Sequence, residues 1–501
     1  MKAFLGFAIT LAIAVTLLLP YTFEPVPALK LHTKDGDVLL TAYGEEKLEG
    51  EIQTFCTQCH GFPDPALYPA YHWPSEIDRA YNFHEQSGDP DILEPDSQLV
   101  LAWFKKNATR TVEITKGEGP KDKTVFGSPT KSPKLKSRAG TSSFAVRHGE
   151  DTTILSTDML NGKITSFQLG SSDYEVLYRG TNPSRIRPCD LSDQFEEEYL
   201  VSELGTPGVT DELCGKVVWL RRTGSTEEFE AVTICDQVGR VSDAKAADFD
   251  GDGDADVLIA EFGWNKTGSV ILLEQDEGKF NRSEIDGRHG LVEIGIADFN
   301  NDGMLDFAGI FGQEFETVEI FYNQGSLNFE PTQLFQAETP SFGICSLNLV
   351  DADNDGDLDI QFTSGDMYDG YHFQDTHGLY LLTNNDGQFE SQMISEQPAV
   401  LSSTAGDVDG DGDIDFIGGT FIPQQSSYAL TSAYPAIVLH EQTSPGVWEQ
   451  RVLKSGDCCH AALKLHDMDK DGDLDLVVGT LHDVRGKPEP GIAIWENHSS
   501  K

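Results

Sequence analysis

The stretch Asp248–Asp256 reads Asp-Phe-Asp-Gly-Asp-Gly-Asp-Ala-Asp, and the apolar run Val257–Ala260 follows it at once. Acidic residues occupy positions 1, 3, 5 and 9 of this nine-residue pattern, and glycine occupies position 6. The pattern occurs five times with a period of 50 to 60 residues, and the other copies start at Asp298, Asp351, Asp407 and Asp467; in the second copy Asn300 replaces the acidic residue at position 3. Such a period indicates a repeat architecture, in which each acidic loop is joined to a strand.

The acidic positions form five candidate ligand sets for a hard cation. Calcium takes six to eight oxygen ligands at flexible geometry, and glycine at position 6 permits the tight turn around the ion. We therefore predict about five Ca²⁺ sites, with these ligands: Asp248, Asp250, Asp252 and Asp256; Asp298, Asn300, Asp302 and Asp306; Asp351, Asp353, Asp355 and Asp359; Asp407, Asp409, Asp411 and Asp415; Asp467, Asp469, Asp471 and Asp475.

Two related loop types do not fit. An EF-hand requires glutamate at position 12 and a following helix, whereas position 12 here is Ile259, Gly309, Phe362, Gly418 or Val478. Nonapeptide solenoids would repeat every nine residues, which this chain does not do. An acidic turn without a bound ion is the remaining alternative.

Over residues 185–495 the repeats resemble the FG-GAP/VCBS family, whose units form the blades of a β-propeller like the head of integrin α-chains. The resemblance implies four-stranded antiparallel blades, with the acidic loop between the first and second strands. For one unit it predicts strands at Lys245–Ala247, Val257–Glu261 and Ser269–Glu274, and a fourth near Phe280.

Two further blades precede the five acidic loops. Asp190, Ser192, Gln194 and Glu198 occupy the ligand positions of a degraded loop, and an earlier unit has four short strands and no loop, at Phe144–Arg147, Thr153–Thr157, Lys163–Leu169 and Tyr174–Arg179. The predicted fold is an all-β seven-bladed β-propeller over residues 142–501. Because the last unit ends without a fourth strand, a strand from before blade one, within Thr111–Ser128, is expected to close the ring.

A second module is indicated by Cys56-Thr57-Gln58-Cys59-His60, the pattern of covalent c-type haem attachment. In that pattern the two thiols form thioethers and the histidine is the proximal iron ligand. A thioredoxin-like redox pair and half of a zinc site are the alternatives. The surrounding sequence lacks the βαβ pattern that a thioredoxin-like pair would need. It also lacks the second cysteine pair that a zinc site would need.

The flanks of this motif resemble a small all-α cytochrome c domain over residues 40–110. Helices are expected at Glu45–Phe55, at Ser75–Phe83 after Pro74, and from Asp96 or Ser97 through Phe104. Cytochromes c commonly use methionine as the second axial ligand, but this chain has no methionine between Met1 and Met159. We predict His84 in that role, with His72 second and a five-coordinate iron third. Histidine ligation predicts a low reduction potential.

The N-terminus predicts export. Lys2 precedes an apolar stretch from Ala3 to Leu19, so residues 1–28 are interpreted as a signal peptide or an uncleaved signal anchor. We expect an extracytoplasmic protein, periplasmic or secreted, with membrane anchoring through this segment as one option.

The charge of the chain restricts its partners. A formal net charge of −47 argues against nucleic acid, and it favours a redox partner protein or a small-molecule electron donor. Residues 111–141 contain the basic, proline-containing segment Lys116–Arg138 and are interpreted as a linker. Six cysteines remain outside the haem motif. Cys214 with Cys235 is the favoured disulfide, and Cys458 with Cys459 is a candidate vicinal one.

The propeller face opposite the acidic loops is expected to gather polar side chains: Arg240, Trp264, His289, Tyr368, His372, His377, Cys459, His460 and His482. The predicted function is exported electron transfer through haem, with the calcium-binding propeller as a docking or substrate-binding scaffold. The alternatives are a periplasmic oxidoreductase with its active site on the propeller and haem as built-in acceptor, and a calcium-dependent adhesion or interaction protein. Whether the chain is an enzyme stays open.

Overall fold

The computed structural model describes residues 43–58, 62–68, 70, 73–87, 94–108, 125–133, 138–149, 151–224, 228–276, 278–368, 373–424, 426, 434–482 and 490–499. The predicted signal segment, most of the predicted linker, Cys59, His60, His72 and His372 lie outside these residues.

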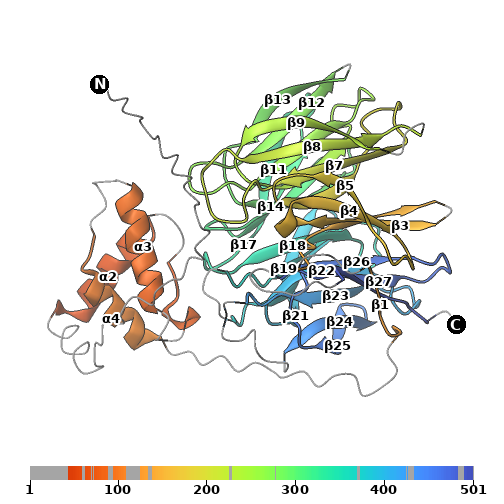
Figure 1. The fold of residues 1–501 in the computed structure, drawn as a ribbon. Coiled ribbons are helices and arrows are strands. Elements are labelled where there is room, and N and C mark those ends of the chain that lie inside the picture. The colour runs from red at the N-terminus through yellow and green to blue at the C-terminus, as the bar shows by residue number, and fades with distance from the viewer. Residues whose placement is uncertain are drawn as a thin grey trace, which may run out of the picture.

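Most of the described chain forms seven four-stranded antiparallel sheets, which confirms the seven-bladed propeller (Figure 1). Blades one to three are β2 (Phe144–His148), β3 (Thr152–Asp158), β4 (Lys163–Gln168), β5 (Glu175–Arg179); β6 (Pro183–Pro188), β7 (Glu197–Glu203), β8 (Gly215–Arg222), β9 (Glu230–Val238); and β10 (Val241–Ala247), β11 (Asp256–Glu261), β12 (Ser269–Asp276), β13 (Lys279–Asp286). Blades four and five are β14 (Leu291–Ala297), β15 (Asp306–Phe311), β16 (Thr317–Asn323), β17 (Phe329–Gln336); and β18 (Ile344–Val350), β19 (Asp359–Ser364), β20 (Gly378–Asn385), β21 (Gln388–Glu396). Blade six is β22 (Val400–Gly406), β23 (Asp415–Thr420), β24 (Pro435–Ser444) and β25 (Val447–Ser455).

Blade seven is completed by the segment that precedes blade one. Its strands are β26 (Ala462–His466), β27 (Asp475–Gly479), β28 (Ile492–Trp495) and β1 (Thr130–Lys131), in which Thr130 pairs with Ile494. A bridge between Phe126 and Asn497 extends this pairing. The expected N-terminal closing strand is therefore present, and it lies at and just beyond the end of the predicted range.

Neighbouring blades are joined by apolar clusters. One cluster combines Phe307 and Phe321 of blade four with Leu258 and Leu272 of blade three, and another combines Ile154 of blade one with residues of blade seven. The second strands are buried on both faces, as in β11 and β15, because each blade is packed between two others. Fourth strands such as β13 are mostly exposed, and in Figure 1 β13 and β25 lie at opposite margins of the propeller.

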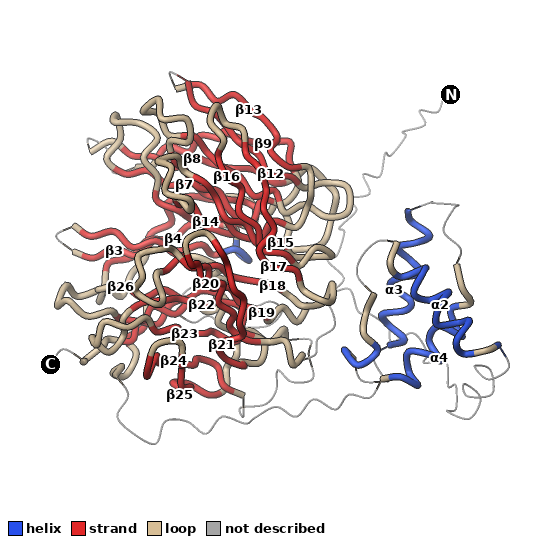
Figure 2. Tube along the Cα trace, turned by 180° about the vertical axis from the view of Figure 1, so that it is seen from behind, coloured by secondary structure: helices blue, strands red, loops and turns tan. Residues whose placement is uncertain are grey.

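The helical part contains α2 (Glu45–Cys56), η1 (Pro65–Leu67), α3 (Trp73–Ser87) and α4 (Ser97–Asn107), which appear in blue in Figure 2. The three predicted α-helices are thus present. The Asp96 carboxylate caps α4 by accepting hydrogen bonds from the N–H groups of Gln98 and Leu99. The core of this unit consists of Leu48, Ile52, Tyr68, Trp73, Ile77, Val100, Ala102, Trp103 and Phe104. None of the helices described is long and apolar enough to cross a membrane.

The predicted disulfide between Cys214 and Cys235 is wrong in this structure. Cys214 and Cys235 are both free thiols, because Cys235 pairs with Val217 across the β8–β9 hairpin while Cys214 lies before β8. The hairpin expected from the sequence is present, but its register separates the two cysteines. Cys458 is likewise not bridged to Cys459.

Candidate cation sites and haem module

Each acidic loop is closed by the same hydrogen bond, from a backbone N–H group to an aspartate side chain. The N–H of Gly253, at position 6, donates to Asp248 Oδ2 at position 1 over 3.1 Å. Gly253 has a φ of +100°, which a side chain would disfavour. The bond recurs in the other four loops, between Gly303 and Asp298, Gly356 and Asp351, Gly412 and Asp407, and Gly472 and Asp467.

The aspartate at position 9 ties its loop to the blade. Asp256 is the first residue of β11, where its Oδ2 accepts from Phe249 N–H at 3.2 Å and its Oδ1 accepts from Gln275 N–H in β12 at 2.9 Å. Asp306, Asp359, Asp415 and Asp475 are held in the same way. Glu198 of the degraded loop also accepts from the position-2 N–H, that of Leu191, which confirms that blade two is built on the same plan.

Burial makes these carboxylates costly to ionise. It raises the pKa of Asp256 and of Asp359 to about 6 and that of Asp415 to about 7, and the acidic neighbours within each loop add to the shift. A bound cation would reverse this effect by favouring the ionised form. The loops therefore hold negative charge that a cation would stabilise.

The ligand atoms converge in several loops. Carboxylate oxygens lie within 4.8 Å of one another in four of them, at Asp248, Asp250 and Asp252; Asp351, Asp353 and Asp355; Asp407, Asp409 and Asp415; and Asp467, Asp469 and Asp475. In the loop that starts at Asp298, the Asn300 side chain donates to Asp302 at 2.9 Å. This donor set contains only oxygen, which suits calcium better than a transition metal.

The described part of the predicted haem-attachment sequence lies at the end of a helix. Helix α2 ends at Cys56, which is partly buried against the helical core. The predicted ligand His84, on α3, packs edge-on against Phe55 with ring centroids 5.3 Å apart, and its Nε2 lies 3.6 Å from Glu94 Oε2. The structure thus places His84 beside the residue that precedes Cys56, and its role in iron ligation stays a prediction.

Several of the polar residues expected to form a site opposite the acidic loops are engaged by neighbouring groups, and the site itself stays a prediction. Arg240 donates to the carbonyl of Gly263, and the buried His377 Nδ1 accepts from Ala399 N–H at 3.1 Å. Burial lowers the pKa of His460 to about 3, and its Nε2 lies 3.1 Å from Lys454 Nζ. His289 pairs with Glu314 at 2.7 Å.

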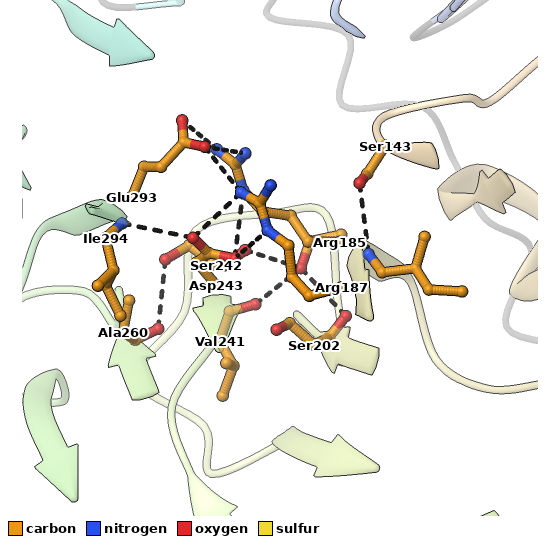
Figure 3. Close-up of polar contacts among 12 residues, drawn as sticks. Ser143, Arg185, Arg187, Ser202, Val241, Ser242, Asp243, Ala260, Glu293 and Ile294 are labelled. Atoms are coloured by element: carbon orange, nitrogen blue, oxygen red, sulfur yellow. Dashed lines mark hydrogen bonds and ion pairs between the residues drawn. The ribbon is translucent and has the colours of Figure 1, made fainter. Parts of the chain in front are cut away.

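Sequence reasoning missed a charged network on the inner strands (Figure 3). Arg185 and Arg187 of β6 both contact Glu293 of β14 at 2.7 Å, and Arg187 also contacts Asp243 of β10 at 3.0 Å. Asp243 is fully buried, and Glu293 is 6% exposed. The signal was present in the repeat, because Arg185, Asp243 and Glu293 each stand five residues before the first position of a loop.

Comparisons with known proteins support the repeat. A family model described as FG-GAP-like repeat matches residues 298–361, which contain two of the acidic loops. No curated protein matches the chain. Among solved structures, the chain is similar to one described as a luciferin-regenerating enzyme, with 16% identity over 66% of this chain and 100% of that chain and a TM-score of 0.38.

The protein is therefore a seven-bladed β-propeller that carries an FG-GAP-like repeat, together with a small helical unit. A propeller scaffold of this kind suggests a binding or interaction role.

Proposed function

We propose that this chain is an extracytoplasmic electron-transfer protein, in which Cys56 and Cys59 attach a c-type haem and His60 and His84 supply its axial ligands. The observation that carries the proposal is the Cys-x-x-Cys-His sequence that begins at the last residue of α2. The position of His84 against Phe55 supports it, because this places an imidazole near the start of the motif. Haem bound there would exchange single electrons.

The calcium loops complete the proposal. Five Ca²⁺ ions would neutralise part of the net charge of −47 and would fix the loops between the first and second strands of blades three to seven. The propeller then serves as a rigid docking or substrate-binding scaffold for a redox partner or a small electron donor. The export predicted from residues 1–28 suits this arrangement, because calcium is abundant outside the cytoplasm and c-type haem is attached there.

The test is a reduced-minus-oxidised absorption spectrum, with a mass measurement, of the protein exported from a host that attaches haem c. We expect a c-type spectrum and a mass increase that both disappear in Cys59→Ser. Addition of candidate small-molecule donors then distinguishes a carrier from an oxidoreductase. Only an oxidoreductase would catalyse the oxidation of a donor, many molecules per protein, and pass the electrons to its haem. A mature protein with the mass of its amino acids alone and no Soret absorption would overturn the haem assignment.

The sixth ligand has its own test. His84→Met should raise the midpoint potential, since methionine ligation raises the potential of cytochromes c. His498→Met is the matched control, because His498 is an exposed histidine of the propeller. Unchanged potential and spectrum in His84→Met would exclude His84 as a ligand.

A calcium-dependent interaction protein without haem is the second candidate. It is favoured by the convergent loop carboxylates, which require no redox chemistry. Absence of covalent haem together with calcium-dependent stability would select this function.

A further inference from the structure

The inner strands of the propeller carry a second charge pattern that the calcium loops do not use. A basic residue stands three positions before the start of the loop on three of the inner strands. These residues are Arg187 on β6, Lys245 on β10 and Lys464 on β26. These three residues have equivalent partners on the second strand of their blades, namely Leu200, Leu258 and Val477. Each partner follows the position-9 residue of its loop by two residues. The three cations therefore lie at one level of the ring. The same level on β14, β18 and β22 holds the uncharged residues Gly295, Asn348 and Thr404.

These side chains extend toward the propeller axis. Arg187 of blade two contacts Glu293 of blade four at 2.7 Å, although blade three lies between them in the ring. Lys464 of blade seven stands at the same level of its inner strand as Arg187, with blade one between them. The ion pair between Arg187 and Glu293 joins blades that are not neighbours, so these side chains must reach into the central channel.

The charges in this channel do not balance. Arg185, Arg187 and Lys245 lie around Asp243 and Glu293, and Lys464 adds a fourth cation at the level of Arg187. Four cations against two carboxylates leave a surplus of two positive charges, in a chain whose net charge is −47. Both carboxylates are already engaged by the arginines, whereas no described carboxylate lies within ion-pair distance of either lysine. Burial, followed by repulsion from Arg187, lowers the pKa of Lys464. The same two causes lower the pKa of Lys245 to about 8, although Asp243 and Glu293 act in the opposite direction. An anion between these groups would remove both costs.

We propose that Arg187, Lys245 and Lys464 form a binding site for a small oxyanion on the axis of the propeller. A group with two or more oxygens can accept charge-assisted hydrogen bonds from several of these cations at once. Tetrahedral oxyanions and small dicarboxylates share this chemistry. The site depends on the propeller alone and does not require the haem.

The probes are sulfate and succinate at low millimolar concentration, added to the full protein in calcium-containing buffer. Binding is measured by isothermal titration calorimetry and by the melting temperature. We expect saturable binding of at least one probe, weakened about tenfold or more in Lys245→Met and in Lys464→Met, because each loses a charge-assisted hydrogen bond. Lys279→Met, on the exposed strand β13, is the matched control and should bind like the wild type.

The variants also separate binding from a structural role. Without a probe, Lys245→Met should melt at or above the wild-type temperature, because it removes a desolvated and repelled cation. Binding of sulfate alone assigns a tetrahedral ligand, and binding of succinate alone assigns a dicarboxylate. Absence of saturable binding of either probe, equal binding by both lysine variants and the wild type, or a large loss of stability in Lys245→Met without a probe would overturn the proposal.

Discussion

Phe126→Ala tests how the propeller closes. Phe126 lies well before blade one in the sequence, yet it pairs with Asn497 and is only 3% exposed in the cluster that joins blades six and seven. Backbone hydrogen bonds from Gly127 to Glu496 and from Ser132 to Ile492 accompany it, at 2.7 and 2.9 Å. The substitution keeps these bonds and removes only the ring.

The expected loss can be worked from burial. Phenylalanine to alanine in a packed core costs about 3–5 kcal/mol, and we expect about 3 kcal/mol because an outermost strand can relax around the missing ring. With an unfolding entropy of about 2 cal/mol/K per residue, a propeller of this size should melt about 4 °C lower. That loss would equal the effect of an interior substitution, although the residue precedes the first blade.

Thermal and urea unfolding of the propeller, measured in calcium, provide the assay. Val176→Ala on β5 is the control, because Val176 is 37% exposed on the outer strand of blade one and should change stability by less than about 0.5 kcal/mol. If Phe126→Ala also lost less than about 0.5 kcal/mol, the ring would not be closed by this segment, and the pairing of β1 with β28 would be refuted.

Three further predictions concern the loops and the channel. In chelator, the free energy of unfolding should fall as the pH rises from about 4 to about 7. The pKa of Asp415 is about 7 in the folded state and lower in the unfolded state, so the folded state holds one extra proton in that window. Melts followed by circular dichroism should show this dependence, and added calcium should weaken it. Gly356→Ala should cost about 1–3 kcal/mol and weaken calcium binding in a titration, because its φ is +100°. Arg187→Met should cost about 3 kcal/mol in urea unfolding, because it leaves the buried carboxylates of Asp243 and Glu293 partly unpaired.

Each of these predictions has an opposing result. Asp415→Asn should reduce the pH dependence in chelator, so an unchanged slope would assign that dependence to general charge repulsion. A Gly356→Ala protein that melts and binds calcium like the wild type would contradict the strained loop. An Arg187→Met protein as stable as the wild type would mean that the channel carboxylates are hydrated or protonated.

The repeat could be predicted from the sequence because its signals are local. A loop of nine residues with aspartate at position 9 fixes where β11 and its counterparts begin, since the carboxylate binds the backbone of its own loop and of the third strand. The apolar run after it predicts a strand buried on both faces. Capping by Asp96 was equally local, and the start of α4 followed from it.

The long-range features needed the tertiary structure. The partner of β28 is β1, 364 residues away at Thr130 and Ile494, and no local pattern selects a two-residue strand at that distance. The register of β8 with β9 separates Cys214 from Cys235, because a shift of a few residues along a hairpin changes which side chains are opposite.

The sequence by itself therefore determined the number of blades, the acidic loops and the helices, because each depends on residues within a few positions of one another. Only the tertiary structure decided which side chains meet on the axis. Arg187, Asp243 and Glu293 lie in three separate blades, and closure of the ring brings their charges into contact. Coulomb interactions depend on distance in space, so a charge pattern spread over distant repeats acquires its meaning only after folding.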